Sequence, residues 1–114
     1  VLHANGVRIE SHTASHPDLR TMSGPVIEEE LEEADTLIAA RLGRKPAYFA
    51  YPYGYENKRV RTVAHSRYRA CFTTRLAYLG AEDDLAALPR LDSHYLRSPR
   101  LVRQLDRPAG RGYI

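Results

Sequence analysis

The chain carries one short segment in which two histidines flank three small residues: Ser11-His12-Thr13-Ala14-Ser15-His16-Pro17. His12 and His16 stand four residues apart, and neutral imidazole is a common zinc ligand in proteins. Pro17 disfavours helical backbone geometry at the residue before it, so we expect both histidines on a loop and not on a helix face. The spacing alone does not decide between a metal site and two solvated loop histidines.

A second segment is apolar and aromatic and ends in a turn: Tyr48-Phe49-Ala50-Tyr51-Pro52-Tyr53-Gly54. We predict a buried strand over residues 47–51, followed by a turn at Pro52-Tyr53-Gly54. Residues 7–10 alternate apolar and polar side chains after an Asn-Gly pair, which predicts a short strand before the histidines. Both segments would then follow strands, and ligand sites in parallel α/β folds lie at the carboxyl ends of strands.

Two helices are predicted from apolar spacing and end signals. The first covers residues 24–42, with Ser23 as its N-cap and Gly43 as its stop. The second is capped by Asn57 and ends near residue 66. Its inner face would carry valine and alanine side chains.

The rest of the chain continues the alternation of strands and helices. Residues 69–74 and 88–92 are predicted strands, and residues 98–105 a final helix. Strands that alternate with helices indicate parallel β/α units, so the predicted fold class is α/β.

The two segments together resemble the motifs of the metal-dependent polysaccharide deacetylases, the NodB-homology family of carbohydrate esterases. His12-Thr13-Ala14-Ser15-His16-Pro17 is similar to the family's histidine motif, and Pro52-Tyr53-Gly54 to the end of its next motif. The resemblance covers roughly residues 2–92 and implies part of a NodB-type (β/α) barrel without its N-terminal strands. The family's early Asp-Asp motif is absent, and Ala50 stands where an arginine is frequent.

The resemblance also implies roles for individual residues. His12 and His16 would bind zinc or another divalent metal such as cobalt or nickel, and Thr13 would support their loop by hydrogen bonding. The backbone N–H of Tyr53 would hold the developing oxyanion, which makes Tyr53 the implied catalytic residue. Tyr51, Pro52 and Tyr53 would contact the substrate, with the two tyrosine rings as a stacking surface for sugar.

The missing Asp-Asp pair would supply the third metal ligand and the general base. Glu10, Asp18 and Asp92 are alternative third ligands within the chain, although an incomplete site is the simpler interpretation. His94 is a candidate general acid in a poorly matching context.

Charge is unevenly distributed. Residues 1–56 carry 5 basic and 9 acidic side chains, whereas residues 57–114 carry 12 basic and 5 acidic. We interpret the acidic run at residues 28–30 as a solvated helix face, and the arginines at 97, 100, 103 and 107 as a solvated or internally paired stripe. No nucleic-acid motif and no apolar run of membrane-spanning length is present. The single cysteine excludes an internal disulfide.

The sequence therefore predicts a metal-dependent hydrolase that removes acetyl groups from N-acetylated or O-acetylated carbohydrate. It would act on carbon–nitrogen but not peptide bonds. Residues 1–96 are expected to be the C-terminal part of a deacetylase catalytic domain, and residues 97–114 a basic helix and tail. This part alone is expected to be inactive. The alternative is a non-catalytic carbohydrate-binding or interaction module with the same fold. Neither the compartment nor the oligomeric state is indicated.

Overall fold

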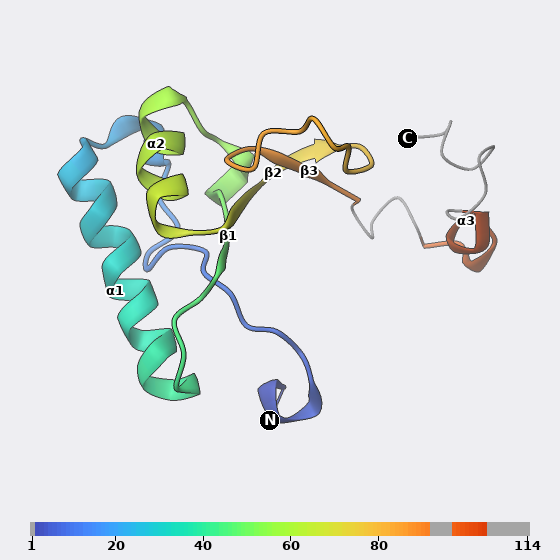
Figure 1. The fold of residues 1–114 in the computed structure, drawn as a ribbon, viewed down its shortest axis with the longest axis horizontal. Helices are drawn as coiled ribbons and strands as arrows, with labels where there is room; N and C mark the ends of the chain where they lie inside the picture. The colour runs from blue at the N-terminus through green and yellow to red at the C-terminus, as the bar shows by residue number, and fades with distance from the viewer. Residues whose placement is uncertain (1, 92–96, 105–114) are drawn as a thin grey trace.

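The computed structural model describes residues 2–91 and 97–104, in which helices and strands alternate as far as the second strand, and the third strand follows it without a helix between them (Figure 1). The strands are β1 (Tyr48–Ala50), β2 (Ala70–Leu76) and β3 (Leu88–Arg90). The α-helices are α1 (Gly24–Leu42), α2 (Lys58–Arg67) and α3 (Pro99–Gln104). Three 3-10 turns are η1 (His3–Asn5), η2 (Leu19–Thr21) and η3 (Pro52–Gly54). The sheet has the order β1-β2-β3 with parallel pairs, which confirms the α/β class.

Helix α1 has the predicted bounds, and its two ends behave differently. Gly43 adopts a left-handed φ of 75° and its N–H donates to Ala39 at 2.9 Å, as a C-terminal glycine cap requires. Ser23 occupies the N-cap position, but its side chain makes no capping hydrogen bond. The second helix is capped as predicted, because the Asn57 side chain accepts from the N–H of Val60 at 2.9 Å.

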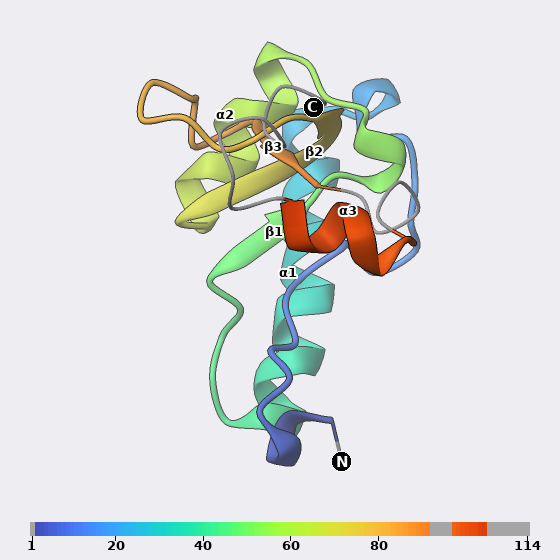
Figure 2. The same ribbon diagram turned by 90° about the vertical axis from the view of Figure 1, so that its right-hand side faces the viewer.

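The core lies between the two long helices and the sheet. Helices α1 and α2 cover the same side of the sheet (Figures 1 and 2). Their inner faces form one buried cluster with the rings of Phe49 in β1 and of Tyr68, the residue directly after α2. The buried cluster consists of Leu19, Ile27, Leu31, Phe49, Tyr51, Val60, Ala64, Tyr68 and Cys71. Phe49 stacks on Tyr68 with ring centroids 5.0 Å apart, so β1 is tied directly to the segment between α2 and β2.

The strand predicted at residues 7–10 is wrong. Only Ser11 pairs with β1, through a single parallel bridge to Phe49. Upstream of that bridge the Glu10 carboxylate accepts the N–H groups of Ala47 and Tyr48, at 2.8 and 3.1 Å. A side chain thus occupies backbone donors that a neighbouring strand would otherwise use.

Glu10 gives a pH-dependent contribution to stability. Partial burial tends to raise the pKa of its carboxyl, but the hydrogen bonds from Tyr48, Arg8 and Ala47 outweigh burial, and the pKa lies below its ordinary value. A folded-state pKa below the unfolded value gives stability that is complete above the unfolded pKa and lost as pH falls through the folded pKa.

We therefore expect Glu10→Gln to lower the free energy of unfolding by about 1–2 kcal/mol at pH 7, because charge-assisted hydrogen bonds are lost. The difference from wild type should shrink at pH 3. Urea unfolding at both pH values measures it, with the exposed Glu33→Gln as control. A difference that is the same at pH 3 and pH 7 would contradict the assignment.

The C-terminal predictions are tested only in part. Strand β3 ends at Arg90 and α3 at Gln104, each near its predicted end, whereas Asp92, His94 and Arg107 lie outside the described residues. The division at residue 96 stays a prediction. Across residues 2–91 and 97–104, no helix combines the length and apolar character needed to cross a bilayer.

Candidate functional site

The two histidines lie on a loop, as predicted, and the loop backbone is unusual. Thr13 has a φ of 71° and His16 a φ of 59°, both in the left-handed region. A β-branched residue such as threonine rarely adopts this conformation. The loop keeps it with the help of an internal bond, because the His16 N–H donates to Thr13 Oγ1 at 3.0 Å. The predicted supporting role of Thr13 is thereby confirmed.

The orientation of the His12 ring is set by the backbone of β1. His12 Nδ1 lies 2.7 Å from the carbonyl oxygen of Ala50, across 38 residues of sequence. A carbonyl only accepts, so Nδ1 carries the hydrogen, and in the neutral imidazole Nε2 keeps its lone pair. Histidines that bind metals commonly donate their other ring N–H in this way. The sequence contained no signal for this contact, because a main-chain atom provides it.

The two imidazoles are neighbours, and an exposed tyrosine lies beside them. The ring centroids of His12 and His16 are 4.7 Å apart, and those of His16 and Tyr53 are 4.6 Å apart. All three side chains are exposed. The structure therefore brings the two predicted motifs together at one place.

Tyr53 sits in a tight turn that follows β1. Its φ is 61° and that of Gly54 is 71°. The Gly54 N–H donates to the Tyr51 carbonyl at 2.8 Å, which closes the turn. The Tyr53 N–H donates to no acceptor within the part of the chain that the structure describes. It is a donor that a ligand can use.

The prediction that Tyr51 offers a sugar-stacking face is wrong. Tyr51 is 2% exposed, and its hydroxyl donates to the Ala86 carbonyl at 2.6 Å. Burial raises the pKa of the Tyr51 phenol above its ordinary value, so the group stays neutral. Pro52 is also buried, which leaves Tyr53 as the exposed ring of the predicted substrate-binding set.

Sequence reasoning missed a second exposed ring next to Tyr53. The Tyr55 ring centroid lies 5.5 Å from that of Tyr53, and the Arg20 guanidinium carbon lies 3.9 Å from the Tyr55 centroid. The Asp18 carboxylate holds Arg20 in place by accepting hydrogen bonds from Arg20 Nε at 3.0 Å and from Arg20 Nη2 at 2.8 Å. The aromatic strip Tyr53–Tyr55 thus extends the surface beside the histidines.

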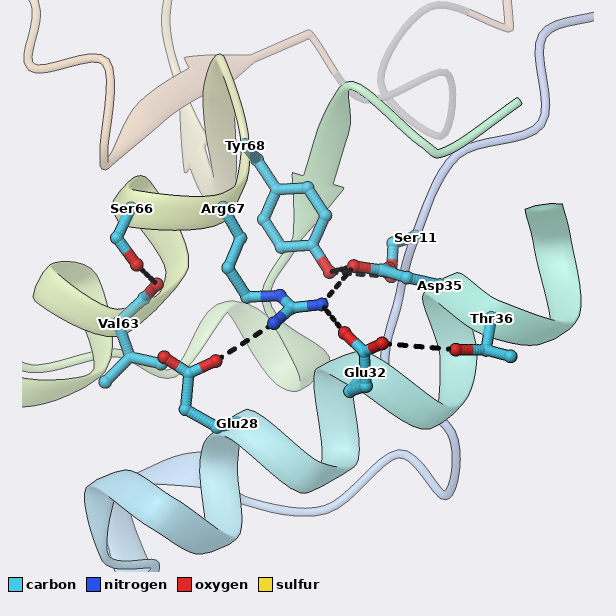
Figure 3. A network of polar contacts seen from close by, with 9 residues as sticks. All are labelled: Ser11, Glu28, Glu32, Asp35, Thr36, Val63, Ser66, Arg67 and Tyr68. Carbon is cyan, nitrogen blue, oxygen red and sulfur yellow. Dashed lines mark hydrogen bonds and ion pairs between the residues drawn. The ribbon is translucent and has the colours of Figure 1, made fainter.

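A polar network links helix α1 to the residue before His12 (Figure 3). The Tyr68 hydroxyl lies 2.7 Å from Asp35 Oδ1 and 3.2 Å from Ser11 Oγ, and all three residues are buried. Burial raises the pKa of Tyr68 above its ordinary value, so the phenol is a stable donor to the carboxylate. Arg67 pairs with Asp35 at 3.0 Å and balances its charge.

Three acidic side chains of α1 have defined partners. Glu28 and Glu32 pair with Arg67 at 3.0 and 2.5 Å, and Glu30 accepts the N–H and the hydroxyl of Ser15 at 2.5 and 2.7 Å. Glu28 and Glu32 are four residues apart and share the helix face toward Arg67 of α2, whereas Glu30 lies about half a turn away and faces the histidine loop. The interpretation of residues 28–30 as a solvated face agrees with Glu28, whose side chain is 46% exposed, and with Glu29, which is exposed, whereas Glu30 is half-buried.

No third metal ligand accompanies the histidine pair among residues 2–91 and 97–104, where no group of three or more His, Cys, Asp or Glu side chains is placed to hold a metal. Of the alternatives, Glu10 is bound by Arg8 and by backbone N–H groups, and Asp18 is bound by Arg20. His65 is exposed on α2, and His3 lies in η1.

Comparison with known proteins gives a consistent picture. A family model described as polysaccharide deacetylase matches residues 1–68. A deacetylase from Streptococcus pyogenes, solved in complex with acetate, is 26% identical with a TM-score of 0.75, covering 79% of this chain and 40% of that protein. No curated protein matched the chain.

Two further solved structures are similar to this chain, which covers a smaller share of each of those proteins. A polysaccharide deacetylase from Bacillus cereus is 26% identical with a TM-score of 0.68, covering 79% of this chain and 29% of that protein. A family 4 carbohydrate esterase pseudoenzyme from Bacillus anthracis is 27% identical with a TM-score of 0.53, covering 58% of this chain and 23% of that protein. The chain thus spans less than half the length of each of these relatives, which agrees with a partial NodB-type fold.

Proposed function

The chain belongs to the polysaccharide deacetylase family, and on that premise we propose that the protein containing it removes acetyl groups from carbohydrate with the help of a divalent metal. The observation that carries the proposal is the arrangement of the histidines. His12 donates Nδ1–H to Ala50 and keeps Nε2 available, and the His16 ring lies 4.7 Å from it.

The donor set fits a metal such as zinc. His12 and His16 would hold it, with a further ligand from outside the described residues, because catalytic zinc commonly has three protein ligands. When bound, such a metal lowers the pKa of water and polarises a carbonyl, the chemistry that amide or ester hydrolysis needs. Imidazole also accepts cobalt and nickel, so the identity of the metal is left to experiment.

Tyr53 is proposed to contribute its backbone N–H to the oxyanion. The turn Pro52–Gly54 presents this N–H without an acceptor among the described residues. A donor that is already oriented toward developing charge is worth about 3–4 kcal/mol in hydrolases. The general base is expected to come from the family's early Asp-Asp motif, which does not precede His12 in this sequence.

The acetylated glycan is proposed to bind along the exposed rings beside the histidines. Tyr53 is 55% exposed and Tyr55 is 44% exposed, so their rings offer apolar area to the C–H faces of sugars. Tyr51 has no part in this surface, because it is buried.

The test is acetate release from N-acetylglucosamine oligomers and from a panel of N- and O-acetylated glycans. The complete open reading frame is assayed as isolated, after chelation, and after zinc is restored. Release that disappears with chelator and returns with zinc is the expected result. Tight zinc binding without release would contradict the carbohydrate substrate, and absence of both would overturn the metal-dependent enzyme.

One observation favours a second candidate, a non-catalytic carbohydrate-binding module. The structural relatives include a protein described as a family 4 carbohydrate esterase pseudoenzyme. Glycan binding without acetate release under every metal condition would support this module. The sequence upstream of His12 discriminates between the two candidates: an Asp-Asp pair there favours the enzyme, and replacement of both carboxylates favours the binding module.

A further inference from the structure

The Glu30 side chain of helix α1 is hydrogen-bonded to the histidine loop. A single carboxylate oxygen, Oε1, accepts both the N–H of Ser15 at 2.5 Å and its hydroxyl at 2.7 Å. Glu30 lies 15 residues after Ser15, on the second turn of a 19-residue helix. The loop is therefore anchored to a rigid element that takes no part in the histidine motif.

The loop needs such an anchor because its backbone is strained. Thr13 and His16 both have positive φ, a conformation that residues other than glycine rarely adopt. Strained residues persist only where their surroundings fix them. The internal bond from His16 N–H to Thr13 Oγ1 fixes one side of the loop. The bonds to Glu30 fix Ser15, the residue directly before His16.

We propose that Glu30 is a positioning residue for the metal site: through Ser15 it holds His16 in the geometry that the metal requires. This inference rests on the proposed function, because it concerns the same histidine pair. Charge-assisted hydrogen bonds are the stronger class, and a carboxylate can accept two donors on one oxygen. In this role Glu30 acts on His16 through Ser15.

The neighbouring Glu29 provides a matched control. It is exposed, its side chain makes no hydrogen bond or ion pair with another described residue, and it carries the same charge on the same helix turn. Substitution of either glutamate removes one negative charge near the site. A difference between Glu30→Ala and Glu29→Ala therefore reports the contact with Ser15 and not general electrostatics.

The readout is the zinc dissociation constant, measured by competition with a chelator on the complete open reading frame. Outer-shell partners typically change metal affinity 10–100-fold, so we expect Glu30→Ala to weaken zinc binding by about that factor. Glu29→Ala should stay within about twofold of wild type, and Glu30→Gln, which keeps an acceptor oxygen, should recover most of the affinity.

A thermal unfolding curve for each variant shows that zinc binding is measured on folded protein. Ser15→Ala, which removes the hydroxyl but keeps the N–H, provides a second variant and should give a smaller loss than Glu30→Ala. Equal zinc affinity for Glu30→Ala and Glu29→Ala, with wild type binding zinc, would overturn this inference alone. Absence of zinc binding by wild type would overturn it together with the proposed metal site.

Discussion

Replacement of His12 by alanine is expected to abolish metal-dependent acetate release by the complete protein. The contact with the Ala50 carbonyl leaves Nε2 of His12 available to a metal. Among the described histidines, His16 alone lies in ring contact with His12. Lewis-acid stabilisation is worth several kcal/mol, and each 1.36 kcal/mol changes a rate tenfold. We therefore expect kcat/KM to fall by about 10³-fold or more.

His65→Ala is the matched control, because His65 is an exposed histidine on α2 outside the site. Its kcat/KM should equal that of wild type. His16→Ala should match His12→Ala, and the double variant should be little worse than either single variant, because the two ligands act as a unit. Retention of full metal-dependent release by His12→Ala would remove His12 from the site.

Gly54→Ala is expected to cause the largest loss of stability among single glycine changes in the described residues. Gly54 has a φ of 71°, and an added Cβ would lie 2.7 Å from Thr74 Cγ2 and 2.8 Å from Thr74 Cβ. The backbone cost is about 1–2 kcal/mol and overpacking costs about 1–3 kcal/mol, so the free energy of unfolding should fall by about 3 kcal/mol.

Gly43→Ala separates the two contributions. Gly43 also has a positive φ, 75°, but nothing lies within 4 Å of its added Cβ. It should lose only the backbone part, about 1–2 kcal/mol. Adding Thr74→Ala to Gly54→Ala should recover part of the loss, because only the contact with Thr74 Cβ remains. Chemical denaturation measures all four proteins, and equal losses for the two glycine variants would contradict the crowding at Thr74.

The sequence predicted those parts of the fold that depend on local signals. Both long helices, the cap at Asn57, the stop at Gly43 and the loop character of residues 11–16 are confirmed, because periodicity and end residues determine them. The strand at residues 7–10 is wrong because alternation does not reveal that Glu10 takes the neighbouring N–H groups.

The sequence predicted the two motifs of the candidate site, but not which rings are exposed or which residues hold the histidine loop in place. Tyr51 and Tyr53 alternate along one segment, yet one ring enters the core and the other remains exposed. The contact between Ser15 and Glu30 joins residues from different elements, and no spacing rule connects them. Roles that the resemblance implied for Tyr53 and the histidines stay predictions until the assays above are made.

The bond between His12 and the Ala50 carbonyl has a consequence for how the site tolerates mutation. Every residue type has the carbonyl oxygen that accepts this bond, so the choice of imidazole tautomer is independent of the side chain at position 50. It depends instead on the alignment of Ser11 with Phe49, which brings the carbonyl opposite the ring. Substitutions at position 50 other than proline would therefore keep the acceptor, whereas proline would remove the N–H that Ala50 donates to Ser11. A one-residue deletion between Pro17 and Phe49 that shifted this alignment would remove the acceptor that selects the Nδ1–H tautomer of His12.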